Sequence, residues 1–346
     1  MFGKLFEEFG IDSLATIKPF GSGLINNTWH IKDGDNDFIL QRINHNVFKK
    51  PKDIATNIRL IADHLGKTHP EYLFVTPVKT ISGNDMVFIE NEGYFRMFPF
   101  IKNSHTVDVV HSTSQAFEAA KQFGRFTDLL SAFPVGELKI TIPDFHNLKP
   151  RYIQFGSAIK DGNQERIKQA TETINFLKEQ YEIVTISEQI NNDPNFKKRV
   201  THHDTKISNV LFDQDEHGLC VIDLDTVMPG YFISDFGDMM RTYLSPVSEE
   251  EKDFSKIEVR EEYFKAIADG YLSEMQHELT AIEKEHLVYA GKFLTYMQAL
   301  RFLTDHLNND VYYGAKYEGH NFIRANNQVA LLKKIIEKEK RLKEMI

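Results

Sequence analysis

Two polar segments on either side of a short apolar run constrain this chain more than any other feature. The first, T-H-H-D-T-K-I-S-N, covers residues 201–209 and contains Asp204, Lys206 and Asn209. The apolar run L-C-V-I follows at 219–222 and ends at Asp223. A short apolar run of this kind is typical of a buried strand. We therefore expect a loop and a strand end that bring an acid, a cation, an amide and a second carboxylate to one place.

These residue types suit phosphoryl transfer from a metal nucleotide. That reaction needs a group to accept the acceptor's proton and oxygen ligands for magnesium. Asp204 can be the base, Lys206 can neutralise the moving phosphate, and Asn209 and Asp223 can hold the ion. The spacing predicts an ATP-dependent kinase that uses Mg²⁺.

Two other interpretations of the same loop remain open. It could be a polar connection between strands, with its histidines satisfied structurally. Alternatively, His202, His203 and Asp204 could form a zinc site. However, adjacent side chains on extended backbone point to opposite faces, so only one histidine could join Asp204 in such a site. His202 is expected to brace the loop backbone, and His203 to shape the pocket.

Composition narrows the class of protein. The chain has 346 residues, 41% of them hydrophobic, which suffices for two domains or one large one. The net charge of −9 argues against binding to nucleic acid or an anionic membrane. The one cysteine, Cys220, cannot form an intramolecular disulfide and is expected to be buried and inert. With no signal peptide or transmembrane run, a cytoplasmic location is expected.

The pattern along the chain predicts an α+β fold with two lobes. Residues 1–102 alternate strands and tight turns around one amphipathic helix at 52–65, with strands at 16–20, 28–31 and 38–43, two more on either side of 82–85, and one at 94–100. Residues 103–346 are mainly helical, with helices expected at 111–133, 164–180, 256–276, 280–307 and 324–345. A small antiparallel sheet lobe before a larger helical lobe is the bilobal arrangement of protein kinases. We expect 1–102 to bind the nucleotide and 103–346 to hold the catalytic and acceptor groups.

The turn between the first two strands is the candidate phosphate-binding element. It reads G-S-G-L-I-N over residues 21–26, and Gly21, Ser22 and Gly23 permit close backbone approach to an anion. Asn26 stands where a third glycine would complete G-x-G-x-x-G. Any hairpin can carry such glycines, so the assignment of this turn to phosphate binding depends on its position before the catalytic loop. At the other end of the nucleotide, backbone around Phe98 and Phe100 is expected to meet the adenine.

A second acidic motif, Asp235-Phe236-Gly237, resembles the metal-binding motif of protein kinases. Asp223 lies closer to the catalytic loop in sequence and ends a strand, so the metal is assigned to Asp223. Asp235 and Asp238 are expected to begin a helix and to brace the catalytic loop.

With these residues placed, the chain resembles the aminoglycoside phosphotransferase and choline kinase superfamily over nearly its whole length, and within it the N-acetylhexosamine 1-kinases. The segments that carry the likeness are G-S-G-L-I-N-N-T-W, F-I-L-Q-R-I-N, Y-F-R-M-F-P-F-I, H-H-D-T-K-I-S-N-V-L-F-D, V-I-D-L-D-T-V-M-P-G and S-D-F-G-D-M-M-R. The resemblance implies transfer of the ATP γ-phosphate to the anomeric hydroxyl of N-acetylglucosamine or N-acetylgalactosamine. It also suggests Arg301 and Tyr312 as sugar contacts, although a solvated helix end with packing tyrosines is the alternative.

One departure from the family pattern concerns the third strand. Such kinases carry a lysine or arginine there to hold the nucleotide phosphates, but this chain has Gln41 at that position, with Arg42 beside it on the other side of a regular strand. Both are nucleotide candidates. The departure slightly favours a non-catalytic nucleotide-binding regulator. Choline, homoserine or an aminoglycoside is the rival acceptor.

Overall fold

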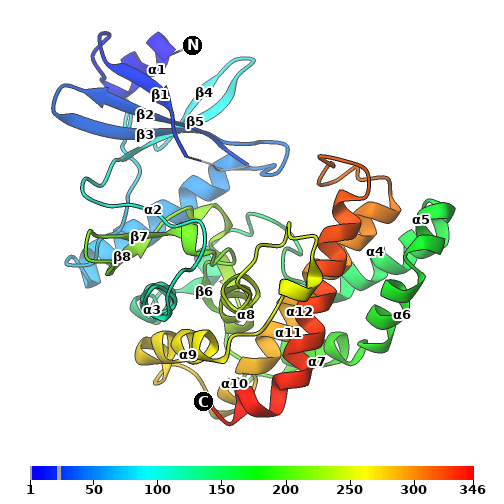
Figure 1. Ribbon diagram of the computed structural model, residues 1–346. Coiled ribbons are helices and arrows are strands. Elements are labelled where there is room, and N and C mark those ends of the chain that lie inside the picture. Colours follow the sequence, from blue (N-terminus) through cyan, green and yellow to red (C-terminus); the bar gives the residue numbers. More distant parts are fainter. Residues whose placement is uncertain (1, 22–24) are drawn as a thin grey trace.

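The computed structural model describes residues 2–21 and 25–346 and has two lobes (Figure 1). A sheet lobe that contains the N-terminus lies above a larger helical lobe that contains the C-terminus. This α+β arrangement confirms the predicted kinase-like fold. The sheet is accompanied by two helices rather than the one expected, α1 (Phe2–Phe9) and α2 (Pro51–Thr68).

Five antiparallel strands in the order β1-β2-β3-β5-β4 build the sheet. Each pairs with its neighbour through a regular ladder, and Gly34, with a φ of 58°, lies in the tight turn between β2 and β3. The strands are β1 (Thr16–Pro19), β2 (Asn27–Asp33), β3 (Asn36–Arg42), β4 (Val87–Ile89) and β5 (Gly93–Pro99).

The two faces of the sheet have different partners because side chains alternate along each strand. Leu40 and Met97 pack on one face with Leu5 and Phe6 of α1, in a small hydrophobic core of their own. The residues next to them in sequence, including Gln41, therefore turn to the opposite face. That face looks toward the helical lobe.

Helix α2 belongs structurally to the helical lobe. Pro51 begins it at a position where its missing N–H costs nothing. Its buried face, with Ile54, Ile58 and Ile61, lies in the same large hydrophobic core as the helices below. Asn57 is buried on this face and donates to the carbonyl oxygens of Lys139 (2.8 Å) and Val227 (3.0 Å).

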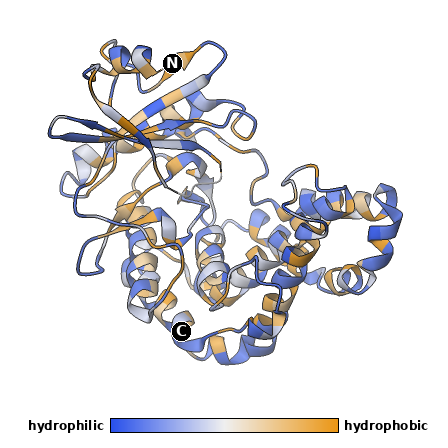
Figure 2. Ribbon diagram, turned by 45° about the horizontal axis from the view of Figure 1, so that its top comes forward, coloured by the Kyte–Doolittle hydropathy of each residue, from blue (hydrophilic) through white to orange (hydrophobic). Residues whose placement is uncertain are grey.

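The helical lobe is built around α11, which is buried along most of its length and packs against α4, α8 and α12. Helices α3 and α9 form a second large pair. Figure 2 shows hydrophilic residues on the outward sides of the peripheral helices. No described helix is long and apolar enough to cross a membrane. The helices are α3 (Thr113–Leu129), α4 (Leu148–Asp161), α5 (Gln164–Gln169), α6 (Thr171–Glu179), α7 (Glu182–Asn192), α8 (Phe232–Tyr243), α9 (Glu261–Met275), α10 (Ala281–Glu285), α11 (Leu287–Leu307) and α12 (His320–Lys343).

Several predicted boundaries differ from the structure. The helix expected at 164–180 is two helices, because the backbone at Ala170 leaves helical geometry (ψ 9°), and His286 divides the one expected at 280–307 in the same way. The apolar spacing continues across both breaks, so it does not reveal them. The segment expected as a strand before residue 82 is irregular and makes one hydrogen bond to the sheet, from Val78 N to Met97 O.

Candidate active site

The predicted catalytic loop joins two short strand pairs that fix both its ends. It follows β6 (Arg199–Thr201), which pairs with β9 (Met228–Gly230), and precedes β7 (Val210–Phe212), which pairs with β8 (Gly218–Val221). The amide of Ile222 donates to the carbonyl oxygen of Asn209 (2.9 Å). This contact places Asp223, the next residue, beside the end of the loop, as the sequence predicts.

Asp204, Lys206 and Asn209 are in direct contact. The Lys206 ammonium lies 3.1 Å from Asp204 Oδ1, and the Asn209 side-chain amide donates to the carbonyl oxygen (2.8 Å) and to Oδ2 (3.2 Å) of Asp204. Burial works to raise the pKa of Asp204, but the charge of Lys206 and its hydrogen bond to the carboxylate outweigh it and hold the pKa below its usual value. The carboxylate is therefore ionised, as a proton acceptor must be.

Asp223 is exposed at the cleft, and its backbone has a left-handed conformation (φ 59°). The protein around the cleft, together with the carboxylates of Asp225 and Asp204, raises its pKa to about 7, although Arg96 and Lys206 oppose the rise. Three neighbouring carboxylates thus repel one another here. A divalent cation would relieve this repulsion.

Magnesium fits the residues present at this point. Asp223 can offer a carboxylate and Asn209 its amide oxygen, because the amide nitrogen is already used in the bonds to Asp204. Magnesium typically takes one or two protein oxygens and completes its shell with water and phosphate oxygens.

Helix α8 braces the catalytic loop from below, as expected for Asp235 and Asp238. The Asp235 carboxylate accepts from the backbone amides of His202 (3.0 Å) and His203 (2.7 Å), and Asp238 accepts from that of Thr205 (2.9 Å). Burial raises the pKa of Asp235 to about 6. The second acidic motif therefore supports the loop instead of opening into the cleft.

The two histidines have different structural roles. His202 is fully buried, and its ring contacts the carbonyl oxygen of Ile222 (2.9 Å), which confirms the expected bracing. His203 has a positive φ (68°), and its ring lies against His146, with the two Nδ1 atoms 3.4 Å apart. Burial lowers the pKa of His203 to about 3, and burial with nearby positive charge also lowers the pKa of His146, so both rings are neutral.

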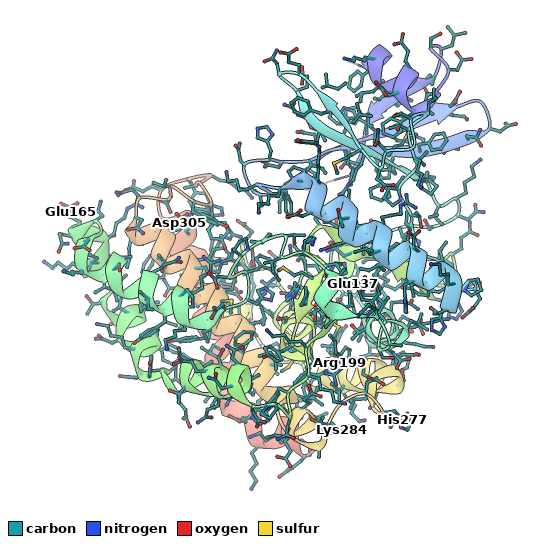
Figure 3. All side chains as sticks on the ribbon, turned by 180° about the vertical axis from the view of Figure 1, so that it is seen from behind. Glu137, Glu165, Arg199, His277, Lys284 and Asp305 are labelled. Carbon is teal, nitrogen blue, oxygen red and sulfur yellow. The ribbon has the colours of Figure 1, made fainter. Side chains whose placement is uncertain are left out.

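A buried ion pair anchors the strand that leads into the loop. Arg199, labelled in Figure 3, donates to the two carboxylate oxygens of Glu283 at 2.8 and 3.0 Å. Glu283 also completes a capping box with Thr280 at the start of α10. The start of the loop is thus tied to the C-terminal helices.

The glycine turn contacts the metal side of the site through Asn26. Its side-chain amide donates to Asp225 Oδ2 (2.7 Å), and its oxygen accepts from the amide of Asn44 (3.0 Å). Gly21 has a φ of 77°, which favours glycine. The predicted contributions of Ser22 and Gly23 lie outside the described residues.

The structure separates the two nucleotide candidates of β3. Gln41 faces the cleft, where its side-chain oxygen accepts from Nε (3.0 Å) and Nη2 (2.8 Å) of Arg96 on β5. Arg42 points to the other side of the sheet and forms an ion pair with Glu92 (3.3 Å). The structure therefore does not bring Arg42 into the site, because strand alternation turns it away. Arg96 was missed, since the cation was sought on the third strand and not on its neighbour.

A pocket of about 340 Å³ lies at the connection between the lobes. It is lined by Phe20, His30 and Phe100, with Asp37, Lys102 and Asn103 at its edge. The ring of Phe100 meets those of His30 (5.0 Å) and Phe20 (5.9 Å) nearly edge-on. This aromatic surface lies next to the glycine turn and suits a flat base. Phe98 lies deeper, under the Arg96 guanidinium at 5.0 Å.

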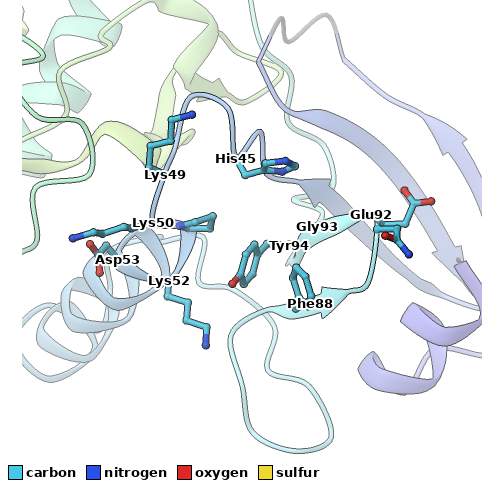
Figure 4. Close-up of a pocket in the computed structure, with 11 residues that line it drawn as sticks. His45, Lys49, Lys50, Lys52, Asp53, Phe88, Glu92, Gly93 and Tyr94 are labelled. Carbon is cyan, nitrogen blue, oxygen red and sulfur yellow. The ribbon is translucent and has the colours of Figure 1, made fainter.

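A larger pocket of about 580 Å³ lies elsewhere, between the start of α2 and the β4–β5 hairpin (Figure 4). Its lining includes Lys49, Lys50 and Lys52 beside Phe88 and Tyr94. None of the predicted catalytic or metal residues lines it. The predicted catalytic and metal residues therefore lie in the cleft and not at this larger hollow.

The predicted acceptor residues lie beyond the catalytic loop. The Arg301 guanidinium stands over the rings of Phe145 (5.6 Å) and Tyr313 (5.4 Å). Tyr312 is exposed, with its ring edge-on to Tyr313 at 4.8 Å. Asp305, labelled in Figure 3, accepts from the backbone amides of both tyrosines and holds the loop that carries them. Tyr313 is thus the ring beside Arg301, one residue from the predicted contact.

The cleft between a sheet lobe and a helical lobe, with an acid, a lysine, an amide and a second carboxylate at its base, is typical of an ATP-dependent small-molecule kinase. Residues 16–278 match the family model described as APH, phosphotransferase enzyme family. Because this match covers most of the chain, the protein belongs to that phosphotransferase family.

Solved structures share the fold over nearly the whole chain. A microcompartment-associated aminopropanol kinase is 16% identical with a TM-score of 0.65, over 98% of this chain and 97% of that one. A spectinomycin phosphotransferase in complex with ADP and spectinomycin is 15% identical with a TM-score of 0.59, over 99% and 97%. A choline kinase from Cryptosporidium parvum is 14% identical with a TM-score of 0.59, over 95% and 91%. At these identities the likeness concerns the fold.

Proposed function

We propose that this protein transfers the γ-phosphate of ATP to the anomeric hydroxyl of N-acetylglucosamine or N-acetylgalactosamine and gives the sugar 1-phosphate. The observation that carries the acceptor class is the charge of the surface beyond Asp204. Arg301 and Arg151 lie there, and neither forms an ion pair with a carboxylate within residues 2–21 and 25–346. The carboxylates of Asp238 and Glu249 are themselves paired with Arg241.

This surface favours an acceptor that presents oxygen atoms. Guanidinium groups donate hydrogen bonds and accept none, so they match hydroxyl and amide oxygens. They repel an acceptor that carries a positive charge. The rings of Phe145 and Tyr313 under Arg301 add the flat apolar surface on which a sugar ring can stack. Choline and aminoglycosides, which are cationic, fit this surface poorly.

The catalytic residues have separate roles in this proposal. Asp204 orients the sugar hydroxyl and accepts its proton late in the transfer, and Lys206 neutralises charge on the moving phosphoryl group. Asn209 and Asp223 would hold magnesium, which supplies positive charge at the terminal phosphates. The aromatic pocket at Phe20 and Phe100 would receive the adenine. Residues 1–102 thus form the nucleotide lobe and 103–346 the catalytic and acceptor lobe, and we place the protein in the cytoplasm.

Homoserine is the second candidate acceptor. Its carboxylate could pair with Arg301 or Arg151, which have no carboxylate partner among the described residues. Its ammonium group would still need an acidic partner, which this surface offers less readily than oxygen contacts. We therefore rank it below a hexosamine.

The test is MgATP consumption across a panel of acceptors, followed by phosphorus NMR of the product. The panel contains both N-acetylhexosamines, glucose, homoserine, choline and an aminoglycoside. We expect turnover with an N-acetylhexosamine and a phosphate signal at the anomeric position. Arg301→Ala should raise the KM for the sugar about tenfold or more and leave the KM for ATP unchanged, while Arg341→Ala on exposed α12 should change neither. Turnover confined to choline or the aminoglycoside would reject the proposal.

A further inference from the structure

Arg96 occupies the place on the sheet where a phosphate-binding cation is needed. In the register of β3 and β5 it lies directly opposite Gln41, and both side chains project from the cleft face. Gln41 is the residue at the position where the family pattern has a lysine or arginine. The cation missing from β3 is therefore present on the neighbouring strand, at the same level of the sheet.

The guanidinium of Arg96 is held in a fixed direction. Two of its nitrogens, Nε and Nη2, donate to the side-chain oxygen of Gln41, and Gln41 in turn contacts Thr28 Oγ1 (3.4 Å). This leaves Nη1 to point away from the sheet, where it forms an ion pair with Asp225 Oδ1. A glutamine at position 41 is thus well suited to orient an arginine on β5, which a lysine there would repel.

The ion pair between Arg96 and Asp225 is buried but incompletely satisfied. Both residues are 2% exposed, and neither Nη1 nor Oδ1 has a partner in hydrogen-bond geometry among the described residues. Burying two charges costs several kcal/mol for each ion unless good hydrogen bonds offset it. Nη1 is therefore a buried cationic donor whose neighbour is the Asp225 carboxylate, in a contact that falls short of good hydrogen-bond geometry.

The position of Asp225 connects this pair to the metal site. Asp225 follows Asp223 by two residues, and Arg96 lies close enough to Asp223 to act on its pKa. The other oxygen of Asp225 accepts from Asn26 in the glycine turn. Arg96 thus points toward Asp225, between Asn26 and Asp223, next to where the proposed site places the phosphates.

We infer that Arg96 is the nucleotide phosphate-binding cation of this protein, that Gln41 orients it, and that Asp225 neutralises it when no phosphate is bound. The inference rests on the proposed nucleotide-binding function but not on the identity of the acceptor. Asp225 thus differs from the helix glutamate of protein kinases, which stays paired with the lysine in the active state. Asn57, at the corresponding region of α2, is instead committed to backbone groups of the helical lobe.

Nucleotide binding by calorimetry tests the inference, because it needs no acceptor. The dissociation constants of MgATP and adenosine are measured for the wild type, Arg96→Gln, Arg96→Lys and Asp225→Asn. We expect Arg96→Gln to weaken MgATP binding at least tenfold and adenosine binding less than twofold, with Arg96→Lys in between. Asp225→Asn should strengthen MgATP relative to adenosine by at least threefold, because Arg96 loses its competing anion.

Arg59→Gln is the matched control. It removes an arginine of α2 that pairs with Asp85, outside the cleft, and should leave the ratio of the two constants unchanged. A merely structural role of Arg96 would weaken both ligands equally or leave both unchanged, and either result overturns the inference. If Arg96→Gln does not fold, an unchanged ratio in Asp225→Asn overturns it as well. A wild type that binds MgATP but phosphorylates no sugar would reject the proposed acceptor and leave this inference standing.

Discussion

Replacement of Asp223 by asparagine should stabilise the protein at alkaline pH when no metal is present. The pKa of Asp223 is raised from 3.8 to about 7. Below about pH 4 this carboxyl is protonated in both the folded and the unfolded protein, so the substitution changes little there. Between about pH 4 and pH 7 the unfolded protein releases this proton while the folded protein retains it beside Asp204 and Asp225, so the stability of the wild type falls across that range and stays level above it. Asparagine carries no charge and tolerates the left-handed backbone at this position.

The size of this effect follows from the raised pKa. At about 1.4 kcal/mol for each pH unit, the rise to about 7 corresponds to a ceiling of about 4 kcal/mol. Because the side chain opens onto solvent, screening reduces this to roughly 1–2 kcal/mol. In a chain of this size the melting temperature should then rise by roughly 2–5 °C at pH 8.

The assay is thermal unfolding of Asp223→Asn and wild type from pH 4 to pH 8, in EDTA and in MgATP. Asp108→Asn, which removes one exposed carboxylate from a loop, controls for the change in net charge. In EDTA the gain should be absent near pH 4, grow as the pH rises toward 7 and level off above that. In MgATP the order should reverse, because only the wild type can gain stability from the bound metal nucleotide. A variant that melts at or below the wild-type temperature at pH 8 in EDTA would refute the reasoning.

Four further substitutions have defined outcomes. Asp204→Asn should lower kcat by at least a hundredfold and leave MgATP affinity within a few-fold in calorimetry, and near-normal turnover would contradict its role as the base. Asp235→Asn leaves one of two backbone amides without an acceptor. It should lower the free energy of unfolding, measured with denaturant, by about 2–3 kcal/mol and lower turnover as well. A variant with normal turnover would show that the catalytic loop does not need this support. Gly237→Ala would place a methyl group 2.2 Å from the carbonyl oxygen of Ala290 in α11 and should lower the free energy of unfolding by about 2–3 kcal/mol. Gly66→Ala, with open space around it in α2, should raise the free energy of unfolding by about 0.5–1 kcal/mol. Equal effects of the two substitutions would contradict the packing argument.

Short-range patterns were sufficient to predict much of the sheet and the catalytic loop. Strand alternation around Leu40 and the turn at Gly34 are local signals, and so is the spacing of Asp204, Asn209 and Asp223. Helix α1 has a comparable signal in the spacing of Phe2, Leu5, Phe6 and Phe9, but it is short and went unpredicted. The structure shows that these residues cover the outer face of the sheet.

Other parts of the site depend on contacts between distant segments. Arg96 and Asp225 are 129 positions apart, and their meeting follows from the approach of two lobes, which no local period encodes. Arg301 was found through the family resemblance, but the choice between Tyr312 and Tyr313 depends on how Asp305 folds the following loop. Which ring faces inward is a property of that loop and not of the sequence pattern.

The membership of α2 in the large hydrophobic core has a mechanical consequence. Separating Ile54, Ile58 and Ile61 from the helices below would expose apolar surface at a cost of about 25 cal/mol per Å². Movement between this large core and the small core of the sheet and α1 exposes far less apolar surface. We therefore expect the sheet and α1 to move as one rigid body while α2 stays fixed to the helical lobe. The hinges are expected in the irregular stretches at 43–50, 69–86 and 100–104. Movement of the sheet and α1 alone would then admit the nucleotide.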